Sequence, residues 1–118
     1  MLNQVTVITV TYNSAHCLAA LGAALIDFPN VIVVDNGSDD DCATLTLNHL
    51  PQAHVLALSK NLGFGAANNR ALAQVQTPFA LLLNPDCEIT PQADGIRLHT
   101  KGGNIHDITA QGWNHFKQ

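Results

Sequence analysis

Four apolar runs alternate with segments of helical character, and this alternation limits the fold more than any other feature of the chain. The runs are short and rich in valine, isoleucine and leucine, as buried strands are. They cover residues 5–10, 31–34, 55–58 and 79–83. Strands that alternate with helices in this way predict an α/β domain with a parallel sheet and right-handed crossovers.

Proline residues help to place the helices between these strands. Residues 18–25 carry apolar side chains at three- and four-residue spacing, and Pro29 lies just beyond them. Pro51 ends a second helix, which we expect over residues 42–50. An alanine-rich third helix is expected over residues 66–75. Each predicted helix therefore connects two predicted strands.

The end of the chain has a different character. Residues 91–118 show no sustained periodicity, so we expect residues 1–90 to form the α/β unit and the remainder a divergent tail. Two short runs in this tail, residues 96–100 and 105–109, flank a Gly-Gly turn at residues 101–104. This pattern predicts a β-hairpin.

Composition limits which kind of protein this can be and where in the cell we expect it. A length of 118 residues with 47% hydrophobic residues fits one folded domain, and a net charge of −4 excludes a general nucleic-acid binder. The odd number of cysteines, Cys17, Cys42 and Cys87, argues against a disulfide framework. With no signal peptide or membrane span in the sequence, we expect a cytoplasmic protein, with peripheral contact at the inner face of a membrane as the alternative.

Polar or glycine-bearing segments follow each of the four predicted strands. They occupy residues 11–13, 35–38, 59–65 and 84–86. Because ligands bind beyond the carboxyl ends of the strands in open α/β sheets, these segments predict a single binding rim. In an acidic protein, a phosphorylated ligand at such a rim needs a metal ion or backbone amides to offset the repulsion.

Two carboxylates on this rim are candidate ligand-binding groups. Asp35 could accept hydrogen bonds from a nucleobase or a ribose hydroxyl, although a cap or turn role explains it equally. Asp86 follows a very apolar predicted strand, with Pro85 between them, and a carboxylate in this position is a suitable oxygen ligand for Mg²⁺ or Mn²⁺. Glu88 lies two residues further on, so its side chain points the same way if the chain stays extended. The alternative for Asn84-Pro85-Asp86 is a plain turn.

The loop Gly63-Phe64-Gly65 precedes a predicted helix, whose first N–H groups could meet phosphate oxygens. It is not a dinucleotide fingerprint, because Asn68 replaces the third glycine and the loop follows the third strand. Arg70 and Lys60 could each pair with a diphosphate or simply be solvated. The six histidines show no paired metal-ligand spacing.

The order of these segments is more specific than any one of them, and it resembles the successive signatures of family 2 glycosyltransferases, which have the GT-A fold. The Asn-Pro-Asp variant of the metal motif looks most like rhamnosyltransferase-type members, and the match runs from residue 4 to about residue 90. The matching segments are residues 7–13, 33–40, 61–69 and 82–86. The resemblance implies a Rossmann-like nucleotide-diphospho-sugar transferase fold.

The resemblance also implies roles for individual residues. Thr11 and Tyr12 would pack against the nucleobase, Asp35 would hydrogen-bond it, and residues 61–69 would lie along the ribose and diphosphate. Asp86 would hold a divalent metal, Mn²⁺ or Mg²⁺, with Asn84 in the place of the first carboxylate. The nucleotide-binding residues implied are Thr11, Tyr12, Asn13, Asp35, Asn61, Gly63, Gly65, Asn69, Arg70 and Asn84.

The activity implied is inverting transfer of a sugar from a dTDP- or UDP-linked donor to a carbohydrate or lipid-linked acceptor hydroxyl, in bacterial surface polysaccharide synthesis. After Asp86 the sequence departs from the family pattern, and we expect the usual helix to be missing or shortened and the acceptor half with the catalytic base to be absent. The alternative is therefore a catalytically incomplete nucleotide-binding or assembly module, with a homodimer formed through an exposed sheet edge. A phosphoacceptor receiver domain fits poorly, because residues 11–13 lack the acidic residues expected there.

Overall fold

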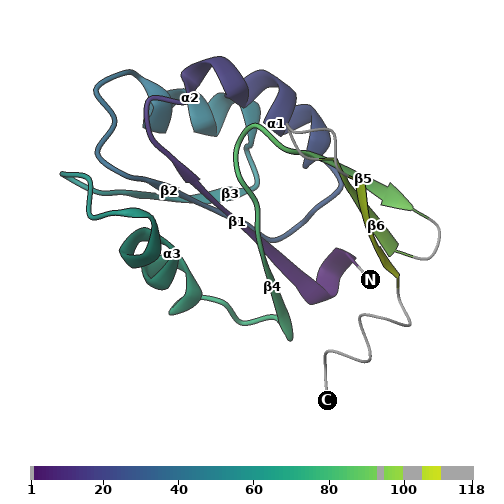
Figure 1. Cartoon of the computed structure of the whole chain (residues 1–118). Coiled ribbons are helices and arrows are strands. Elements are labelled where there is room, and N and C mark those ends of the chain that lie inside the picture. The colour runs from purple at the N-terminus through teal and green to yellow at the C-terminus, as the bar shows by residue number, and fades with distance from the viewer. Residues whose placement is uncertain (1, 93–94, 100–104, 110–118) are drawn as a thin grey trace.

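The structure is a computed structural model, which describes residues 2–92, 95–99 and 105–109 (Figure 1). Two short 3₁₀ turns, η1 (Leu2–Gln4) and η2 (Ala15–Cys17), flank the first strand. The α-helices are α1 (Leu18–Ala24), α2 (Cys42–His49) and α3 (Phe64–Leu72). The strands are β1 (Val5–Thr11), β2 (Val31–Asp35), β3 (Ala53–Ala57), β4 (Phe79–Leu82), β5 (Glu88–Gln92), β6 (Gly95–His99) and β7 (Ile105–Thr109).

The first four strands form one parallel sheet in the order β3-β2-β1-β4, which confirms the predicted α/β class. Val10 lies opposite Val34 in the register between β1 and β2, and Val34 lies opposite Leu56 in the register between β2 and β3. Every residue of β1 and β2 is buried, as expected for the inner strands of a parallel sheet covered on both faces. The carboxyl ends of these strands therefore meet at one edge of the sheet.

Helices cover the two faces of this sheet, and Figure 1 shows α1 and α2 on one side and α3 on the other. On the α1–α2 face, Val7 and Val33 pack with Leu21 in the larger apolar cluster. On the opposite face, Ile8 packs with Ala67 of α3 in a smaller cluster. The period-2 alternation of side chains along β1 thus supplies both cores.

The last three strands form a second, antiparallel sheet in the order β5-β6-β7. Ile89 and Ile96 are 3% and 1% exposed and join the core on the α1 side of the main sheet. Strand β5 spans the boundary expected at residue 90, and nothing in the sequence predicted it, because Pro91 and an irregular polar pattern hide it. The turn expected at residues 101–104 lies outside the described residues, whereas β6 and β7 on either side of it pair antiparallel.

Both predicted ends of the third helix differ from the structure by two or three residues. Helix α3 begins at Phe64 rather than residue 66, because Gly63 adopts a φ of 89° that turns the chain directly into the helix. It ends at Leu72, and the next residues continue as turns in which Gln74 N–H bonds to Ala71 O and Val75 N–H bonds to Leu72 O. Of the helices that the structure describes, none has the length and apolar character needed to cross a membrane.

Candidate functional site

The loops at the carboxyl edge of the sheet are joined by hydrogen bonds that extend the strand pairing. Asn36 N–H donates to Thr11 O at 2.8 Å, and Leu58 N–H donates to Asp35 O at 2.9 Å. These bonds hold the ends of β1, β2 and β3 level with one another. Three of the four segments that the sequence predicted to form a rim are therefore joined by hydrogen bonds at this edge.

Asp35 lies at the centre of this rim and is 4% exposed. Its Oδ1 accepts hydrogen bonds from Thr11 Oγ1 at 3.0 Å and from Ser38 Oγ at 2.6 Å, and its Oδ2 accepts one from Ser38 N–H at 3.1 Å. A carboxylate has about four acceptor sites, so Oδ2 keeps capacity for one further donor. Asp35 thus shapes the turn after β2 and still has an acceptor for a ligand.

Asn13 clamps the loop after β1 to the loop after β2. Its backbone N–H donates to Ser38 Oγ at 2.9 Å, and its Oδ1 accepts from Asp39 N–H at 2.8 Å. Asn13 has a φ of 49°, an uncommon conformation for a residue other than glycine, which asparagine tolerates well. The structure therefore uses the side-chain oxygen of Asn13 to position the loop that carries Tyr12, whose side chain is 47% exposed.

A second clamp joins the loops after β2 and β3. Asn36 Nδ2 donates to Asn61 Oδ1 at 3.0 Å, and Asn36 Oδ1 accepts from Leu62 N–H at 2.9 Å. Gly63 N–H also donates to Asn61 Oδ1, at 2.8 Å. The loops approach so closely that a Cβ on Gly37 would lie 2.6 Å from the carbonyl carbon of Lys60. Asn61 and Gly63 are thus positioned by this contact, at the start of α3.

A hollow of about 340 Å³ lies beside the rim, between the loop after β1 and the loop after β4. Four of the predicted residues line it, namely Tyr12, Asn13, Asn84 and Asp86. The complete lining is Tyr12, Asn13, Ser14, His16, Cys17, Asn84, Pro85 and Asp86. The structure thus brings Asp86 next to the Tyr12 loop, although the two are far apart in the sequence.

The other predicted residues lie outside this hollow. Thr11 and Asp35 are buried beneath the rim, whereas Asn61, Gly63 and Gly65 lie in the loop that leads into α3. Asn69 and Arg70 are exposed farther along α3. The predicted nucleotide site is therefore an extended surface with three parts, rather than one enclosed cavity.

His16 was not among the residues predicted for this site. The absence of paired metal-ligand spacing directed attention away from the histidines, and residues 15–17 looked like the beginning of a helix. One signal was available, because His16 lies three residues after the rim segment 11–13. Only the fold shows that this places it across a hollow from Asp86.

The residues around Asp86 fit a divalent metal only when a diphosphate is also present. No group of three histidine, cysteine, aspartate or glutamate side chains able to hold a metal occurs in the part of the chain that the structure describes. Asp86 itself is exposed and lines the hollow. Mg²⁺ is often held by one or two carboxylates together with substrate phosphates, and this donor set suits such an arrangement.

Cys42 lies directly beneath the rim and is fully buried. Burial raises the pKa of its thiol, while a hydrogen bond with the Thr11 side chain acts in the opposite direction. The neutral thiol packs below Asp35 and avoids a second negative charge there. We therefore assign Cys42 a structural role, and the structure has all three cysteines as free thiols.

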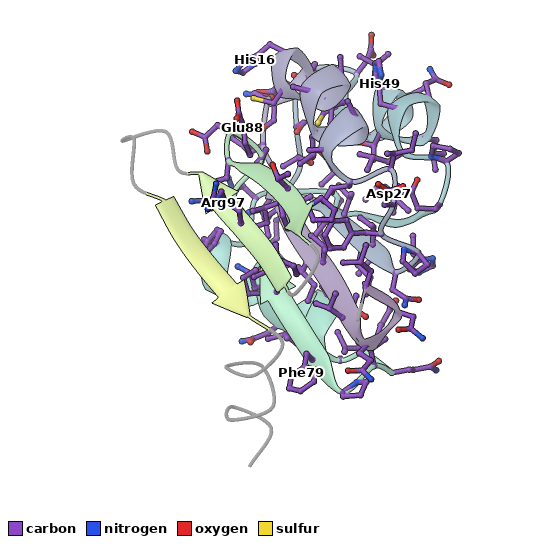
Figure 2. The ribbon with its side chains drawn as sticks, turned by 90° about the vertical axis from the view of Figure 1, so that its right-hand side faces the viewer. His16, Asp27, His49, Phe79, Glu88 and Arg97 are labelled. Atoms are coloured by element: carbon purple, nitrogen blue, oxygen red, sulfur yellow. The ribbon has the colours of Figure 1, made fainter. Side chains whose placement is uncertain are left out.

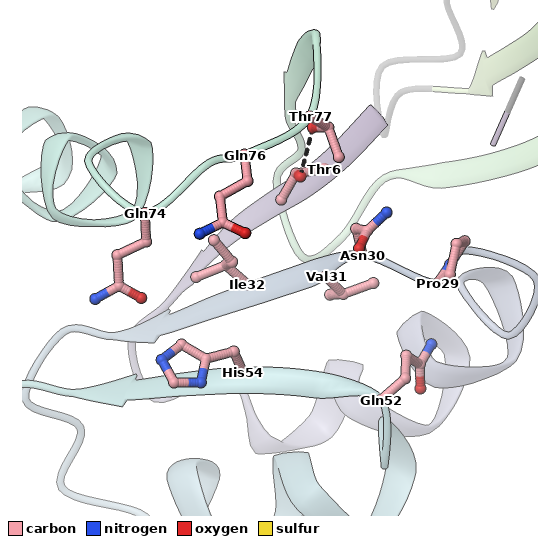
Figure 3. Close-up of a pocket in the computed structure, with 10 residues that line it drawn as sticks. All are labelled: Thr6, Pro29, Asn30, Val31, Ile32, Gln52, His54, Gln74, Gln76 and Thr77. Carbon is pink, nitrogen blue, oxygen red and sulfur yellow. Dashed lines mark hydrogen bonds between the residues drawn. The ribbon is translucent and has the colours of Figure 1, made fainter. Parts of the chain in front are cut away.

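A second hollow, of about 210 Å³, lies at the opposite, amino edge of the sheet (Figure 3). Thr6 and Thr77, which hydrogen-bond to each other at 2.7 Å, line it together with Gln74, Gln76 and His54. It contains none of the predicted site residues and no carboxylate. Because ligands of open α/β sheets bind at the carboxyl edge, we take the rim with the first hollow as the candidate functional site.

Comparison with known proteins agrees with this geometry. The model of the family described as glycosyl transferase family 2 matches residues 6–107. A teichoic acid poly(glycerol phosphate) polymerase from Staphylococcus epidermidis is 28% identical over 93% of this chain and 17% of its own length. An N-acetylglucosaminyl-diphospho-decaprenol L-rhamnosyltransferase from Mycobacterium tuberculosis is 33% identical over 64% of this chain and 26% of its own length.

A third relative, the glycosyltransferase AglJ from Haloferax volcanii, is 31% identical over 96% of this chain and 35% of its own length. The chain thus spans about a third or less of the length of these curated relatives. The family match covers most of the chain, including the parallel sheet except for Val5 at the start of β1. The chain belongs to glycosyl transferase family 2, and its parallel four-stranded sheet flanked by helices has the Rossmann-like arrangement of a GT-A domain.

Proposed function

We propose that this chain binds the nucleotide-sugar donor of a glycosyltransferase that moves a sugar from a dTDP- or UDP-linked donor to an acceptor hydroxyl with inversion. The observation that carries the proposal is the arrangement of Asp35 and Asp86. Asp35 has a remaining acceptor at the centre of the rim, and Asp86 lines the adjacent hollow. A nucleoside diphosphate needs a hydrogen-bond acceptor for its base at one end and compensation for its charge at the other.

We assign the base to the rim and the diphosphate to the hollow. Asp35 Oδ2 would accept an N–H of a pyrimidine base, and the exposed Tyr12 ring would pack against that base. The ribose would lie toward Asn61, in the loop that leads into α3. Asp86 and Asn84 would then face the phosphate that carries the sugar.

A divalent ion would be held by Asp86 together with the diphosphate, and when bound it would stabilise the charge of the departing diphosphate. The chain's own residues bind and orient the donor, and we assign the base that accepts the acceptor's proton to none of the described residues. Residues 1–90 would form the donor-binding part, with the second sheet packed beside it.

The acceptor is proposed from the relatives. One relative is named as a polymerase of teichoic acid, and another as a rhamnosyltransferase with N-acetylglucosaminyl-diphospho-decaprenol in its name. These names support a polymeric or lipid-linked acceptor in bacterial surface polysaccharide synthesis. The three free cysteines favour a reducing compartment, which supports a cytoplasmic location. We do not expect a nucleic-acid partner, because the chain is acidic.

The first test is calorimetric titration of UDP and dTDP into the chain, with and without Mn²⁺. We expect Asp86→Ala to weaken the metal-dependent binding about tenfold or more, since a ligand to the metal is removed. We expect Asp35→Asn to weaken binding with or without metal. The Asn side chain can present an N–H group where the carboxylate oxygen of Asp35 would accept the N–H of the base, and two N–H donors cannot bond to each other. Asp27→Ala is the matched control, since Asp27 is exposed in the turn between α1 and β2. Absence of nucleotide binding by the folded wild-type chain would refute the proposal.

The second candidate is a nucleotide-binding or assembly module that does not itself catalyse transfer. Strand β4 is the outer strand of the described parallel sheet, and its Leu82 is 48% exposed, which would suit a second copy. Light scattering would then give the mass of a dimer, and an assay with a radiolabelled donor would detect no transfer. Transfer by the monomeric chain would exclude this candidate.

A further inference from the structure

His16 is the residue of the hollow that neither the sequence motifs nor the proposed donor contacts explain. It is the middle residue of η2, it is exposed, and it lines the hollow together with Asp86 and Tyr12. In Figure 2, His16 and His49 project from different helical segments at the same end of the molecule. Only His16 of these two lines the hollow.

The backbone around His16 is fixed before any ligand binds. Ala15 N–H donates to Asp40 Oδ2 at 3.2 Å, and Cys17 N–H donates to Ser14 O at 2.9 Å. The next residue, Leu18, is fully buried in the main core. Because both neighbours are held, the backbone that carries the imidazole is already in place beside the hollow, which lowers the entropy cost of a contact.

The charges of the residues that line the hollow indicate which kind of ligand group the imidazole would contact. Among the residues that line the hollow, Asp86 carries the one carboxylate, and His16 is the one side chain that can carry a positive charge. Lys60 and Arg70 are exposed on other segments and are not part of this lining. A diphosphate placed beside Asp86 therefore needs donors, and an imidazole provides an N–H in either protonation state.

We propose that His16 donates a hydrogen bond to the sugar-linked phosphate of the donor, and so makes the site prefer nucleoside diphosphates over monophosphates. This inference rests on the proposed function. The order of the groups identifies the phosphate. Asp35 marks the base end and lies outside the hollow, and Tyr12 is the part of the lining that the base would contact. His16 shares the remainder of the lining with Asp86, the proposed partner of the sugar-linked phosphate, so we assign His16 to that phosphate.

The test compares two probes, UDP and UMP, by calorimetry at a fixed Mn²⁺ concentration. We expect His16→Ala to weaken UDP binding about tenfold and to leave UMP binding unchanged, since one hydrogen bond to a charged group is lost. His16→Gln should recover part of the UDP affinity, because its amide keeps an N–H donor. His49→Ala is the control, because His49 is an exposed histidine at the end of α2 outside the hollow.

Each alternative outcome has a definite meaning. If His16→Ala leaves UDP affinity unchanged, or weakens UDP and UMP equally, the assigned phosphate contact is wrong. If UDP binds in a way that depends on Asp35 and Asp86 but not on His16, the inference fails while the proposed function stands. If the folded wild-type chain binds neither nucleotide, both are refuted. Melting curves of the variants should match the wild type, because His16 is exposed.

Discussion

At the scale of single residues, the interior of the described sheet contains a buried hydroxyl oxygen that makes no hydrogen bond and so does not stabilise the fold. Thr9 is fully buried in β1, and its Oγ1 has no hydrogen-bond partner among the described residues. We expect Thr9→Val, which keeps the shape and removes the hydroxyl, to raise the free energy of unfolding by about 1 kcal/mol. Urea denaturation followed by circular dichroism measures this change.

Thr6 provides the matched control in the same strand. It is 4% exposed, and its Oγ1 hydrogen-bonds to Thr77 Oγ1 at 2.7 Å. Thr6→Val should therefore lower the free energy of unfolding, because it leaves the Thr77 hydroxyl without this partner. Equal destabilisation by both variants would show that Thr9 Oγ1 has a partner after all, such as a buried water molecule.

At the scale of elements, the contact between α1 and α2 depends on Gly22. A Cβ at this position would lie 2.3 Å from the carbonyl oxygen of His49, a backbone atom that cannot rotate away. We expect Gly22→Ala to lower the free energy of unfolding by about 1–3 kcal/mol, because the overlap outweighs the gain of about 1 kcal/mol in helix propensity. Chemical denaturation measures this loss.

Gly65 is the control for helix propensity without a steric clash. It lies in the first turn of α3, and a Cβ there would meet nothing within 4 Å. Gly65→Ala should therefore be neutral or slightly stabilising. If Gly22→Ala is equally well tolerated, the helices can separate at little cost, and the close approach of α1 and α2 does not limit the fold.

Individual elements also show how far the sequence could predict this structure. Strands β1 and β2 were predicted almost to the residue, because their unbroken β-branched runs are buried on both faces. Strand β5 was missed, because Pro91 interrupts its run and its pairing depends on β6 rather than on a local pattern. The positions of Asp35 and Asp86 at strand ends followed from the alternation, whereas the Asn13 and Asn36 clamps depend on distances between loops that no periodicity encodes.

At the scale of the whole molecule, the question is whether the second sheet is part of the same folding unit as the first. The sequence suggested a boundary near residue 90, yet Ile89 and Ile96 pack in one cluster with Leu18 and Phe28. Residues on both sides of the expected boundary therefore share a core. We propose that the two sheets unfold together.

This proposal makes a prediction for Ile96, which is 1% exposed in β6. We expect Ile96→Ala to lower the free energy of unfolding by about 2–5 kcal/mol, since it removes buried methyl groups and leaves a cavity. Unfolding should remain a single transition, with circular dichroism and hydrogen exchange of β1 amides reporting the same loss of stability.

Thr90→Ala is the control and should change the free energy of unfolding by less than about 0.5 kcal/mol, because Thr90 is exposed on the neighbouring strand β5. If Ile96→Ala instead unfolds the second sheet while exchange in β1 keeps its wild-type protection, the two sheets are separate cooperative units, and the rim is stable without β5 and β6.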